Sequence, residues 1–342
     1  MVSANRYTEV HLRPQGPGDA RPTALQIIHD EGLQGQLTGK TILITGTSSG
    51  LGLETVRALA STGATIFCAA RNPAKNEAAL ADIQACSRSS GGRLELLEAD
   101  LSSLASVRIA AADFLSRSGG RLNILINNAG VMGLPQKQVS VDGVELQFAT
   151  NHLGHFLLFV LLREALLASA TSDMPSRVVN VSSAAHRFSG IHPGNYNLGF
   201  GLYNPWVAYG QSKTARIYMA TAIERRYGGK GLHGLAVNPG TVFTGAQRHL
   251  DDEYKERWMR NEKQAKCVKS VEQGAATTVL AAVGKEFEGR GAVYIQDCGE
   301  WGPAGTIDFG PDKQGYAPHA FDFEMEERLW VDSCRMVGVP ED

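Results

Sequence analysis

Short apolar runs alternate with longer amphipathic segments along most of the chain from Thr38 onward. Seven of these runs are predicted to be strands, namely Thr41–Thr45, Thr65–Ala69, Leu94–Glu98, Ile124–Asn127, Val178–Val181, Leu232–Val237 and Ala292–Ile295. Each run is almost entirely apolar, which is typical of strands that lie in a sheet covered by helices on both faces. The spacing of apolar residues between the runs predicts helices at Leu51–Ser61, Ala74–Cys86, Leu104–Ser116, Gly143–Ala170, Val207–Tyr227 and Val271–Val283.

This alternation predicts one α/β domain with a doubly wound parallel sheet of the Rossmann type, with about seven strands. Residues 1–36 are rich in Pro, Gly and charge, and we expect them to be an N-terminal extension with a short helix near Ala24–Glu31. Residues 37–342 are expected to form the domain itself. Its long irregular segments, 187–206, 241–267 and 296–323, follow strand ends, so they are expected to build a substrate pocket or lid.

The composition narrows the function classes without selecting one. The chain of 342 residues has a formal net charge of −2 and no cluster of basic residues, so nucleic-acid binding has little support. Its five cysteines are scattered and lack metal-ligand spacing, which predicts reduced thiols, no metal site and a cytoplasmic location. The apolar stretch Leu153–Ala170 contains Arg163 and Glu164, so we expect a buried helix and not a membrane span.

The first predicted strand leads directly into the glycine-rich turn TGTSSGLG, residues 45–52, and then into a helix. In such a turn Gly46 permits a tight bend, Gly50 lets the backbone approach a pyrophosphate, and Gly52 allows the helix to pack closely against the strand. A glycine-rich turn between a strand and a helix is strong evidence for a dinucleotide site. The expected contacts are Gly46, Ser48, Ser49, Gly50, Leu51 and Gly52.

The end of the second strand indicates which dinucleotide is bound. It has the sequence Ala69–Ala70–Arg71, with no carboxylate to bind an adenosine ribose, and the Arg71 guanidinium suits a 2′-phosphate. We therefore expect NADP(H), although Arg71 could also be an ordinary surface arginine. Asp100 and Leu101 are expected to contact adenine, although Asp100 could equally cap a helix. Asn127–Gly130 ends the fourth strand, where asparagines can join neighbouring strands and the small residues Ala129 and Gly130 leave room beside Asn128 for the cofactor.

Tyr209 and Lys213 are four residues apart and therefore share one face of a predicted helix. An ammonium about 4 Å from a phenol would lower the phenol pKa by roughly three units, enough for acid–base work near neutral pH. Ser183, at the end of the fifth strand, is expected to hydrogen-bond the substrate oxygen. Asn151 is expected to hold a water molecule that connects Lys213 to solvent.

These motifs together resemble the short-chain dehydrogenase/reductase family, from about Thr38 to Ile295. The family pattern TGxxxGxG is present as TGTSSGLG, NNAG as Asn127–Gly130, and YxxxK as Tyr209–Lys213. The resemblance implies a catalytic tetrad of Asn151, Ser183, Tyr209 and Lys213. It also implies that the loop after the sixth strand contacts the nicotinamide side of a cofactor through Pro239, Gly240, Val242 and Thr244.

Within the family the chain is similar to the retinol-dehydrogenase and WW-domain-oxidoreductase-like group. The supporting stretches are TNHLGHFLL, VNVSSAAH and AYGQSK, and the segment RPTALQIIHDEGL resembles leaders of fungal members, some of which act in secondary metabolism. The sequence departs from the group at Gly194–Asn197, so the substrate of the group does not transfer. Tyr196, Phe200, Tyr203 and Trp206 could line an apolar pocket or simply pack under a loop, and His186 is expected to be structural.

The resemblance implies an NADP(H)-dependent oxidoreductase that interconverts an apolar ketone or aldehyde and its alcohol, with Tyr209 as general acid and base. The alternative is a cofactor-binding protein without redox turnover, such as a scaffold, a regulator or a pericyclase-like pocket. An epimerase or dehydratase of the extended relatives ranks lower, because those resemble TGxxGxxG at the turn. The predicted helices Gly143–Ala170 and Val207–Tyr227 could pair across a two-fold axis in a homodimer.

Overall fold

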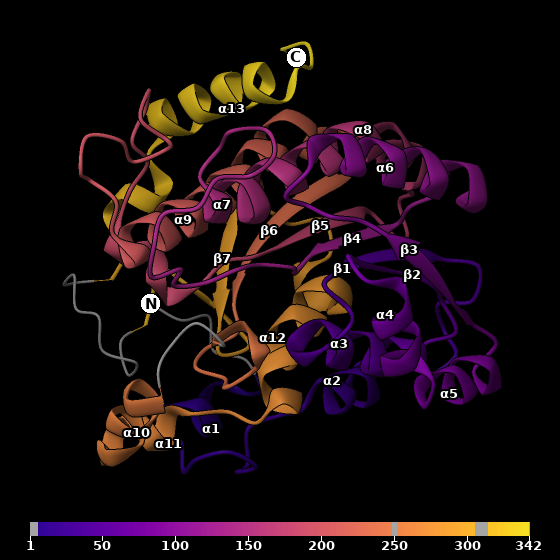
Figure 1. Cartoon of the computed structure of the whole chain (residues 1–342). Helices are drawn as coiled ribbons and strands as arrows, with labels where there is room; N and C mark the ends of the chain where they lie inside the picture. Colours follow the sequence, from indigo (N-terminus) through magenta and orange to yellow (C-terminus); the bar gives the residue numbers. More distant parts are fainter. Residues whose placement is uncertain (1–5, 248–251, 305–313, 342) are drawn as a thin grey trace.

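The computed structural model describes residues 6–247, 252–304 and 314–341. Its centre is one sheet with the strand order β3-β2-β1-β4-β5-β6-β7-β8 (Figure 1). The strands are β1 (Thr41–Thr45), β2 (Thr65–Ala70), β3 (Arg93–Glu98), β4 (Ile124–Asn127), β5 (Ser176–Val181), β6 (Leu232–Asn238), β7 (Val293–Gln296) and β8 (Gly299–Trp301). Neighbouring strands are parallel except for β7 and β8. The predicted doubly wound α/β fold is confirmed.

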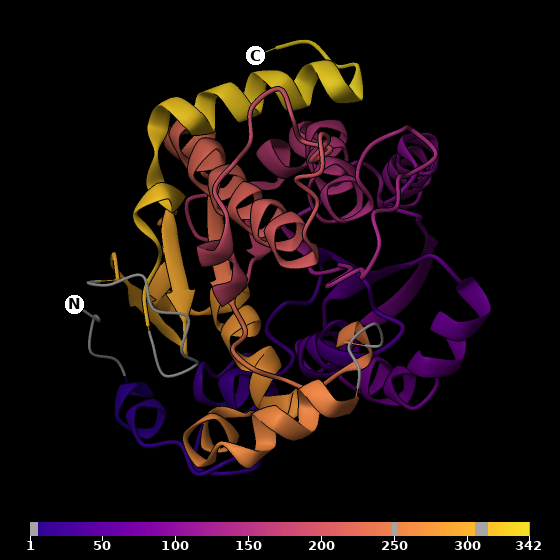
Figure 2. The ribbon, with the colours of Figure 1, turned by 60° about the vertical axis from the view of Figure 1, so that its left-hand side comes forward.

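Helices cover both faces of this sheet (Figures 1 and 2). One layer contains α6 (Leu104–Ser118), α8 (Gly154–Ser169) and α9 (Pro205–Tyr227), and the other contains α2 (Ala24–Asp30), α3 (Gly50–Ala60) and α12 (Val271–Val283). Successive residues of a strand point to opposite faces. Leu43 of β1 accordingly belongs to the core under the first layer, whereas Ile42 and Ile44 belong to the core under the second.

The remaining elements are shorter or lie at the edges of the two layers. The helices are α1 (Thr8–Leu12), α4 (Pro73–Leu80), α5 (Ile83–Ser89), α7 (Leu146–Phe148), α10 (Asp252–Arg260), α11 (Glu262–Cys267) and α13 (Phe323–Val337). A π-helical turn, η1 (Ala149–Leu153), joins α7 to α8. Short 3₁₀ turns are η2 (Ala184–Phe188), η3 (Gly228–Lys230), η4 (Gly245–Gln247), η5 (Lys285–Phe287) and η6 (Pro318–Phe321).

Two predicted elements differ in the structure, and one strand of the structure is not predicted. The expected helix Ala74–Cys86 is divided into α4 and α5 by a turn, although no Gly or Pro marks the break. The expected helix Gly143–Ala170 begins later, because Gly143 has a positive φ of 76° and the Glu145 carboxylate caps the new start at α7. The sequence pattern does not predict β8. It follows β7 after a turn of two residues, Asp297 and Cys298, which both adopt positive φ without the glycine that usually marks such a hairpin.

The C-terminal helix α13 lies across the outer side of the α8 and α9 layer (Figures 1 and 2). The Trp330 ring packs against Phe156 and Phe159 of α8 and against Tyr227 of α9. This is the surface on which the sequence analysis expects a homodimer, so a dimer at this surface would have to displace α13. Among the described residues one helix, Leu146–Ser169, has the length and hydropathy of a membrane span, and most of it is buried inside the protein.

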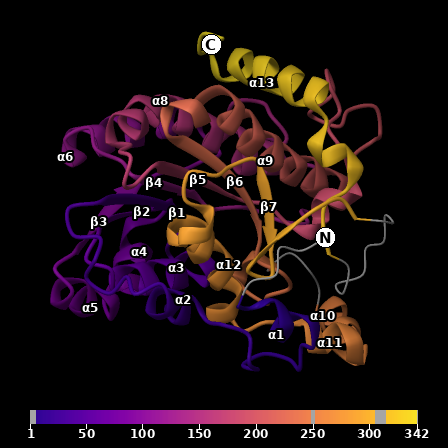
Figure 3. The same cartoon turned by 180° about the vertical axis from the view of Figure 1, so that it is seen from behind.

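The N-terminal segment packs against the domain beside α3 and α12 (Figure 3). Ile27 and Ile28 of α2 are fully buried in the same apolar core as Val279 of α12. Thr23 caps this helix by accepting a hydrogen bond from the Gln26 amide. The predicted short helix near Ala24–Glu31 is thus confirmed, and it is part of the packed core.

We expect Ile27→Ala to lower the free energy of unfolding by about 2–5 kcal/mol, because it leaves a cavity between α2 and the domain. Leu25 lies on the same helix but is 50% exposed, so Leu25→Ala should change stability by less than about 0.5 kcal/mol. Urea denaturation of both variants measures the difference. Equal, small losses would contradict the packing of α2 described above.

Candidate active site

The glycine-rich turn between β1 and α3 has the shape that its sequence predicts. Gly46 and Gly50 have φ values of 76° and 59°, in the left-handed region that favours glycine. A Cβ atom on Gly52 would lie 2.2 Å from the Gly46 carbonyl oxygen, so the start of α3 can approach the turn only with glycine there. Ser49, which precedes α3, makes no side-chain cap, and the first-turn residues of α3 line a cavity. These backbone amides are suited to an anionic ligand such as a pyrophosphate.

This cavity, which we call the turn cavity, has a volume of about 570 Å³ and lies at the carboxyl ends of the parallel strands. It brings together all of the residues that the sequence analysis assigns to cofactor contacts: Gly46, Ser48, Ser49, Gly50, Leu51, Gly52, Arg71, Asp100, Leu101, Asn128, Ala129, Gly130, Tyr209, Lys213, Pro239, Gly240, Val242 and Thr244. Ser183 also lines it. The volume of the cavity, its glycine-rich turn and the uncapped start of α3 fit a dinucleotide. The individual contacts between these residues and a cofactor remain predictions.

Several lining residues are not found by the sequence analysis. Lys75 of α4 lines the turn cavity beside Arg71, and both side chains are exposed. The sequence analysis considers only the residues directly at the end of β2, so it does not include Lys75, which lies four residues after Arg71. Met132 and Gln247 line the cavity as well, but a loop and the short turn η4 leave no spacing signal in the sequence.

Asn127 and Asn128 join neighbouring strands, as their position predicts. Asn127 donates a hydrogen bond from its side chain to the Asn180 side chain on β5, and Asn128 donates to the Thr45 carbonyl of β1. Asp100 accepts hydrogen bonds from the amide and hydroxyl of Ser102, so part of its role is to shape its own turn. The helix cap of α6 is Ser103.

Asn151 lies in the π-helical turn η1 and is fully buried. Its side chain accepts from the Val131 amide and donates to the Val131 carbonyl and the Ser212 hydroxyl. Asn151 lines neither of the two cavities described in this section, so its amide connects the loop after β4 to α9. π-Helical turns are frequent at functional sites, and here the turn places Asn151 between these two segments.

Ser183, Tyr209 and Lys213 meet where β5 ends against α9. The Ser183 and Tyr209 side chains line the same two cavities, and the Lys213 ammonium lies 5.4 Å from the centroid of the Tyr209 ring. Lys213 donates to the Val181 carbonyl at 3.0 Å. The neighbouring Ser182 hydroxyl donates to the Lys213 carbonyl and fixes α9 against the strand.

The electrostatics of this group differ from the expectation of a lowered phenol pKa. Burial raises the pKa of Tyr209 to about 12, and the hydrogen bond with Ser183 acts in the opposite direction only in part. Burial, with the Arg216 guanidinium nearby, lowers the pKa of Lys213 to about 7. The expected lowering of the Tyr209 pKa was wrong for the protein without a ligand. Helical spacing does not reveal how completely the phenol of Tyr209 and the amine of Lys213 are desolvated.

Arg216 follows on the same helix and is almost fully buried. Its guanidinium donates to the main-chain carbonyls of Asn151 and Asn127, so it supports both η1 and the end of β4. Burial lowers the pKa of Arg216 to about 9. The charge of Arg216 disfavours the ammonium form of Lys213, and the sequence motif alone gives no sign of this effect.

A second cavity of about 310 Å³, which we call the side cavity, adjoins the turn cavity. Ser183 and Tyr209 line both, so the two cavities meet at the reactive group. Aromatic residues including Phe188, Trp206 and Phe243 line the side cavity. Its mixture of apolar walls and a few polar groups is typical of a site for a small molecule.

Of the four aromatic residues that the sequence analysis considers for an apolar pocket, only one lines the side cavity. Trp206 lines the side cavity, whereas Phe200 is 99% exposed. Tyr196 stacks on Phe148 and donates to Asp332, and Tyr203 donates to the Leu134 carbonyl, so both pack under the loop.

His186 is fully buried, and its two ring nitrogens contact the Ser183 carbonyl and the Ala317 amide, which confirms that it is structural. The five cysteines are free thiols, as predicted. No group of metal-ligating residues occurs among the residues that the structure describes.

Comparison with known proteins agrees with this geometry. Residues 40–255 match the family model of the short chain dehydrogenases. The chain is 50% identical to short-chain dehydrogenase/reductase prx1 from Penicillium roqueforti over 98% of this chain and 96% of the relative. It is 36% identical to human retinol dehydrogenase 11, over 90% of this chain and 88% of the relative.

A crystal structure of an uncharacterized protein from Mycobacterium paratuberculosis has the same fold. The TM-score is 0.65 at 30% identity, and the alignment covers 95% of this chain and 98% of that chain. The family model spans more than half of the sequence, and the relatives align over nearly all of it. The chain therefore belongs to the short-chain dehydrogenase/reductase family, whose members are oxidoreductases that bind nicotinamide cofactors.

Proposed function

We propose that the protein is an NADP(H)-dependent oxidoreductase that interconverts an apolar ketone or aldehyde and its alcohol, in the cytoplasm and as part of secondary metabolism. The single observation that carries this proposal is the junction of the two cavities at Ser183 and Tyr209. A carbonyl group that enters from the side cavity can reach both hydroxyls while a dinucleotide lies in the turn cavity. A bound nicotinamide would supply or accept the hydride at this junction.

The chain's own residues would perform the acid–base part of the reaction. Ser183 would bind the carbonyl oxygen and keep it beside Tyr209. The raised pKa keeps the Tyr209 phenol protonated at neutral pH, so it can donate a proton to the oxygen as negative charge develops there. Alcohol oxidation needs the phenolate form instead, so the protein alone is poised for reduction. Lys213 would bind the nicotinamide ribose and stabilise charge on the phenol oxygen.

The preference for NADP(H) rests on the residues around the end of β2. No carboxylate stands at Ala69–Ala70–Arg71, and Arg71 and Lys75 both line the turn cavity. Two cations that line the cavity, without a carboxylate at the end of β2 itself, favour a 2′-phosphate over a free ribose hydroxyl. The alternative is a cofactor-binding role without turnover. The meeting of Ser183, Tyr209 and Lys213 at one cavity supports the enzyme over this alternative.

We expect Tyr209→Phe to reduce NADPH-dependent carbonyl reduction by roughly 10²–10⁴-fold, the usual contribution of a general acid. Tyr203→Phe removes the same hydroxyl from a tyrosine that lines neither cavity, and it should retain activity. Because the Tyr209 pKa is raised, the reverse oxidation should accelerate as the pH rises. NADPH absorbance measures both effects, with apolar ketones and aldehydes plus NADPH for the reduction and the matching alcohols plus NADP⁺ for the oxidation. Turnover that survives Tyr209→Phe, or no turnover with any carbonyl, would contradict the proposal.

We expect Arg71→Ala to weaken NADPH binding by about tenfold to a hundredfold, as for the loss of a charge-assisted hydrogen bond. NADH binding should change little, because NADH has no 2′-phosphate. Arg88→Ala is the control, since Arg88 is exposed on α5 and lines neither cavity. Fluorescence titrations with both cofactors measure the change, and an equal loss for NADPH and NADH would rule out the 2′-phosphate role.

A further inference from the structure

One wall of the side cavity comes from the N-terminal segment that precedes the dehydrogenase fold. His11 and Leu12 of α1, with Pro14 and Arg21, line the same cavity as Tyr209. In all three overall views α1 lies far below α9, near α10 and α11 (Figures 1, 2 and 3). The N-terminal segment therefore forms a part of the cavity wall that is separate from α9, the helix that carries the reactive phenol.

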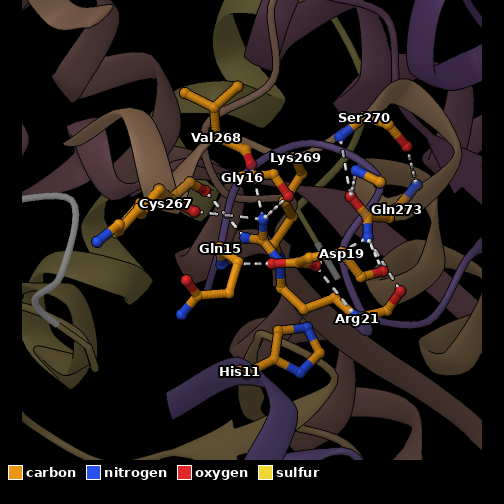
Figure 4. A network of polar contacts seen from close by, with 12 residues as sticks. His11, Gln15, Gly16, Asp19, Arg21, Cys267, Val268, Lys269, Ser270 and Gln273 are labelled. Carbon is orange, nitrogen blue, oxygen red and sulfur yellow. Dashed lines mark hydrogen bonds and ion pairs between the residues drawn. The ribbon is translucent and has the colours of Figure 1, made fainter. Parts of the chain in front are cut away.

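Arg21 fastens this segment to the domain. Its guanidinium is buried, forms an ion pair with Asp19, and donates to main-chain carbonyls on both sides of the contact (Figure 4). These carbonyls belong to Gly16 in the N-terminal segment and to Lys266, Cys267 and Val268 in the domain. A buried guanidinium with several acceptors is a rigid connection, because losing any acceptor leaves a charged donor desolvated.

Gln273, in the first turn of α12, makes a second connection (Figure 4). Its side chain accepts from the Gly18 amide and donates to the Asp19 carbonyl, the Asp19 carboxylate and the Arg21 carbonyl. The nearby Lys269 amide donates to the Thr241 carbonyl, in the loop that lines both cavities. The N-terminal wall is thus fixed relative to the nicotinamide side of the turn cavity.

His11 presents a defined polar atom at this wall. Its Nδ1 lies 2.9 Å from the Tyr7 carbonyl, which can only accept, so Nδ1 carries the proton. Burial, with the charge of Lys269, lowers the pKa of His11 to about 4, which leaves the ring neutral and Nε2 unprotonated. Among the described residues, Nε2 has no hydrogen-bond partner, and it is not sealed from the cavity.

The charged groups around His11 balance one another. Lys269 and Asp297 both line the cavity and form an ion pair with an N–O distance of 2.7 Å. Arg21 is paired with Asp19 at 2.8 Å. This end of the cavity therefore carries no net charge, which disfavours a carboxylate or an ammonium group on a ligand. The unpartnered acceptor on His11 instead suits a neutral hydrogen-bond donor.

We propose that the N-terminal segment selects the substrate, and that His11 Nε2 accepts a hydrogen bond from a hydroxyl group at the end of the substrate remote from the reacting carbonyl. The substrate class is then an apolar carbonyl compound with a distal hydroxyl. This inference rests on the proposed function, because it takes Tyr209 as the place where the carbonyl is bound. It makes His11 a specificity-determining residue outside the family motifs.

The test compares straight-chain aldehydes with their ω-hydroxy counterparts of equal length, using kcat/KM with NADPH. At the chain length that spans the cavity, the hydroxylated member should be preferred by about threefold to tenfold, the size of one hydrogen bond. His11→Asn retains a donor for the Tyr7 carbonyl but lacks an atom at the Nε2 position, so it should abolish this preference. His11→Gln places an acceptor near the Nε2 position and should keep part of it.

His29→Leu and His11→Leu form a matched pair, because the His29 side chain is 73% exposed on α2. Only His11→Leu should remove the preference, whereas His29→Leu should keep both the preference and the reduction of short aldehydes such as propanal. Binding of α,ω-diols and of the matching primary alcohols, measured by calorimetry with NADPH present, gives a readout without turnover, because NADPH cannot oxidise an alcohol. Equal kcat/KM and equal binding within every pair, or a preference unchanged in His11→Asn, would overturn the inference.

The proposed function can fail separately from this inference. Loss of the hydroxyl preference with normal reduction of propanal would leave the role of Tyr209 intact. The opposite outcome is that no aldehyde is reduced, while the diols still bind more tightly than the alcohols and His11→Asn removes that difference. The proposed carbonyl reduction would then be wrong, and the proposed hydroxyl site at His11 would remain supported.

Discussion

The site depends on the packing of α9 against the ends of β4 and β5, which buries Tyr209 and Lys213 together. Gly130, in the loop after β4, lies close to this contact. A Cβ atom there would lie 3.1 Å from the Asn151 side-chain oxygen and 3.6 Å from the Lys213 ammonium, so a larger residue would crowd Asn151.

Burial at this contact sets the chemistry as well as the geometry. Both side chains are moved toward their neutral forms, Tyr209 to a pKa of about 12 and Lys213 to about 7. A neutral phenol is a proton donor, which is the form that carbonyl reduction requires. Arg216 adds to the effect on Lys213 while it supports the Asn151 and Asn127 carbonyls, so one buried residue links the backbone of the site to its charge state.

The sequence predicts the cofactor half of the molecule much better than the substrate half. The β1 turn, the Asn127–Gly130 segment and the Tyr209–Lys213 pair are local patterns whose spacing reflects backbone geometry, and the structure gathers them around one cavity. The side cavity is built from side chains far apart in the chain, such as His11 and Lys269, and no local spacing connects them.

The C-terminal helix α13 is not among the predicted helices, although its sequence carries recognisable signals. Asp322 is its N-cap, Gly338 adopts the left-handed conformation at its end, and Leu329 and Trp330 lie on its buried side. Helices α10 and α11 are short and rich in charged residues, and they lie in the segment 241–267 that the sequence analysis expects to be irregular. The phenol pKa could not be predicted, because it depends on the depth of burial in the folded protein.

The most direct test of the central claim is a crystal structure of the protein with NADP⁺ bound. The account predicts the pyrophosphate at the Gly46–Gly52 turn and the nicotinamide beside Tyr209, with the phenol hydroxyl facing the side cavity. A nicotinamide outside the junction of the two cavities, or a Tyr209 hydroxyl that points away from it while Lys213 binds elsewhere, would contradict the account.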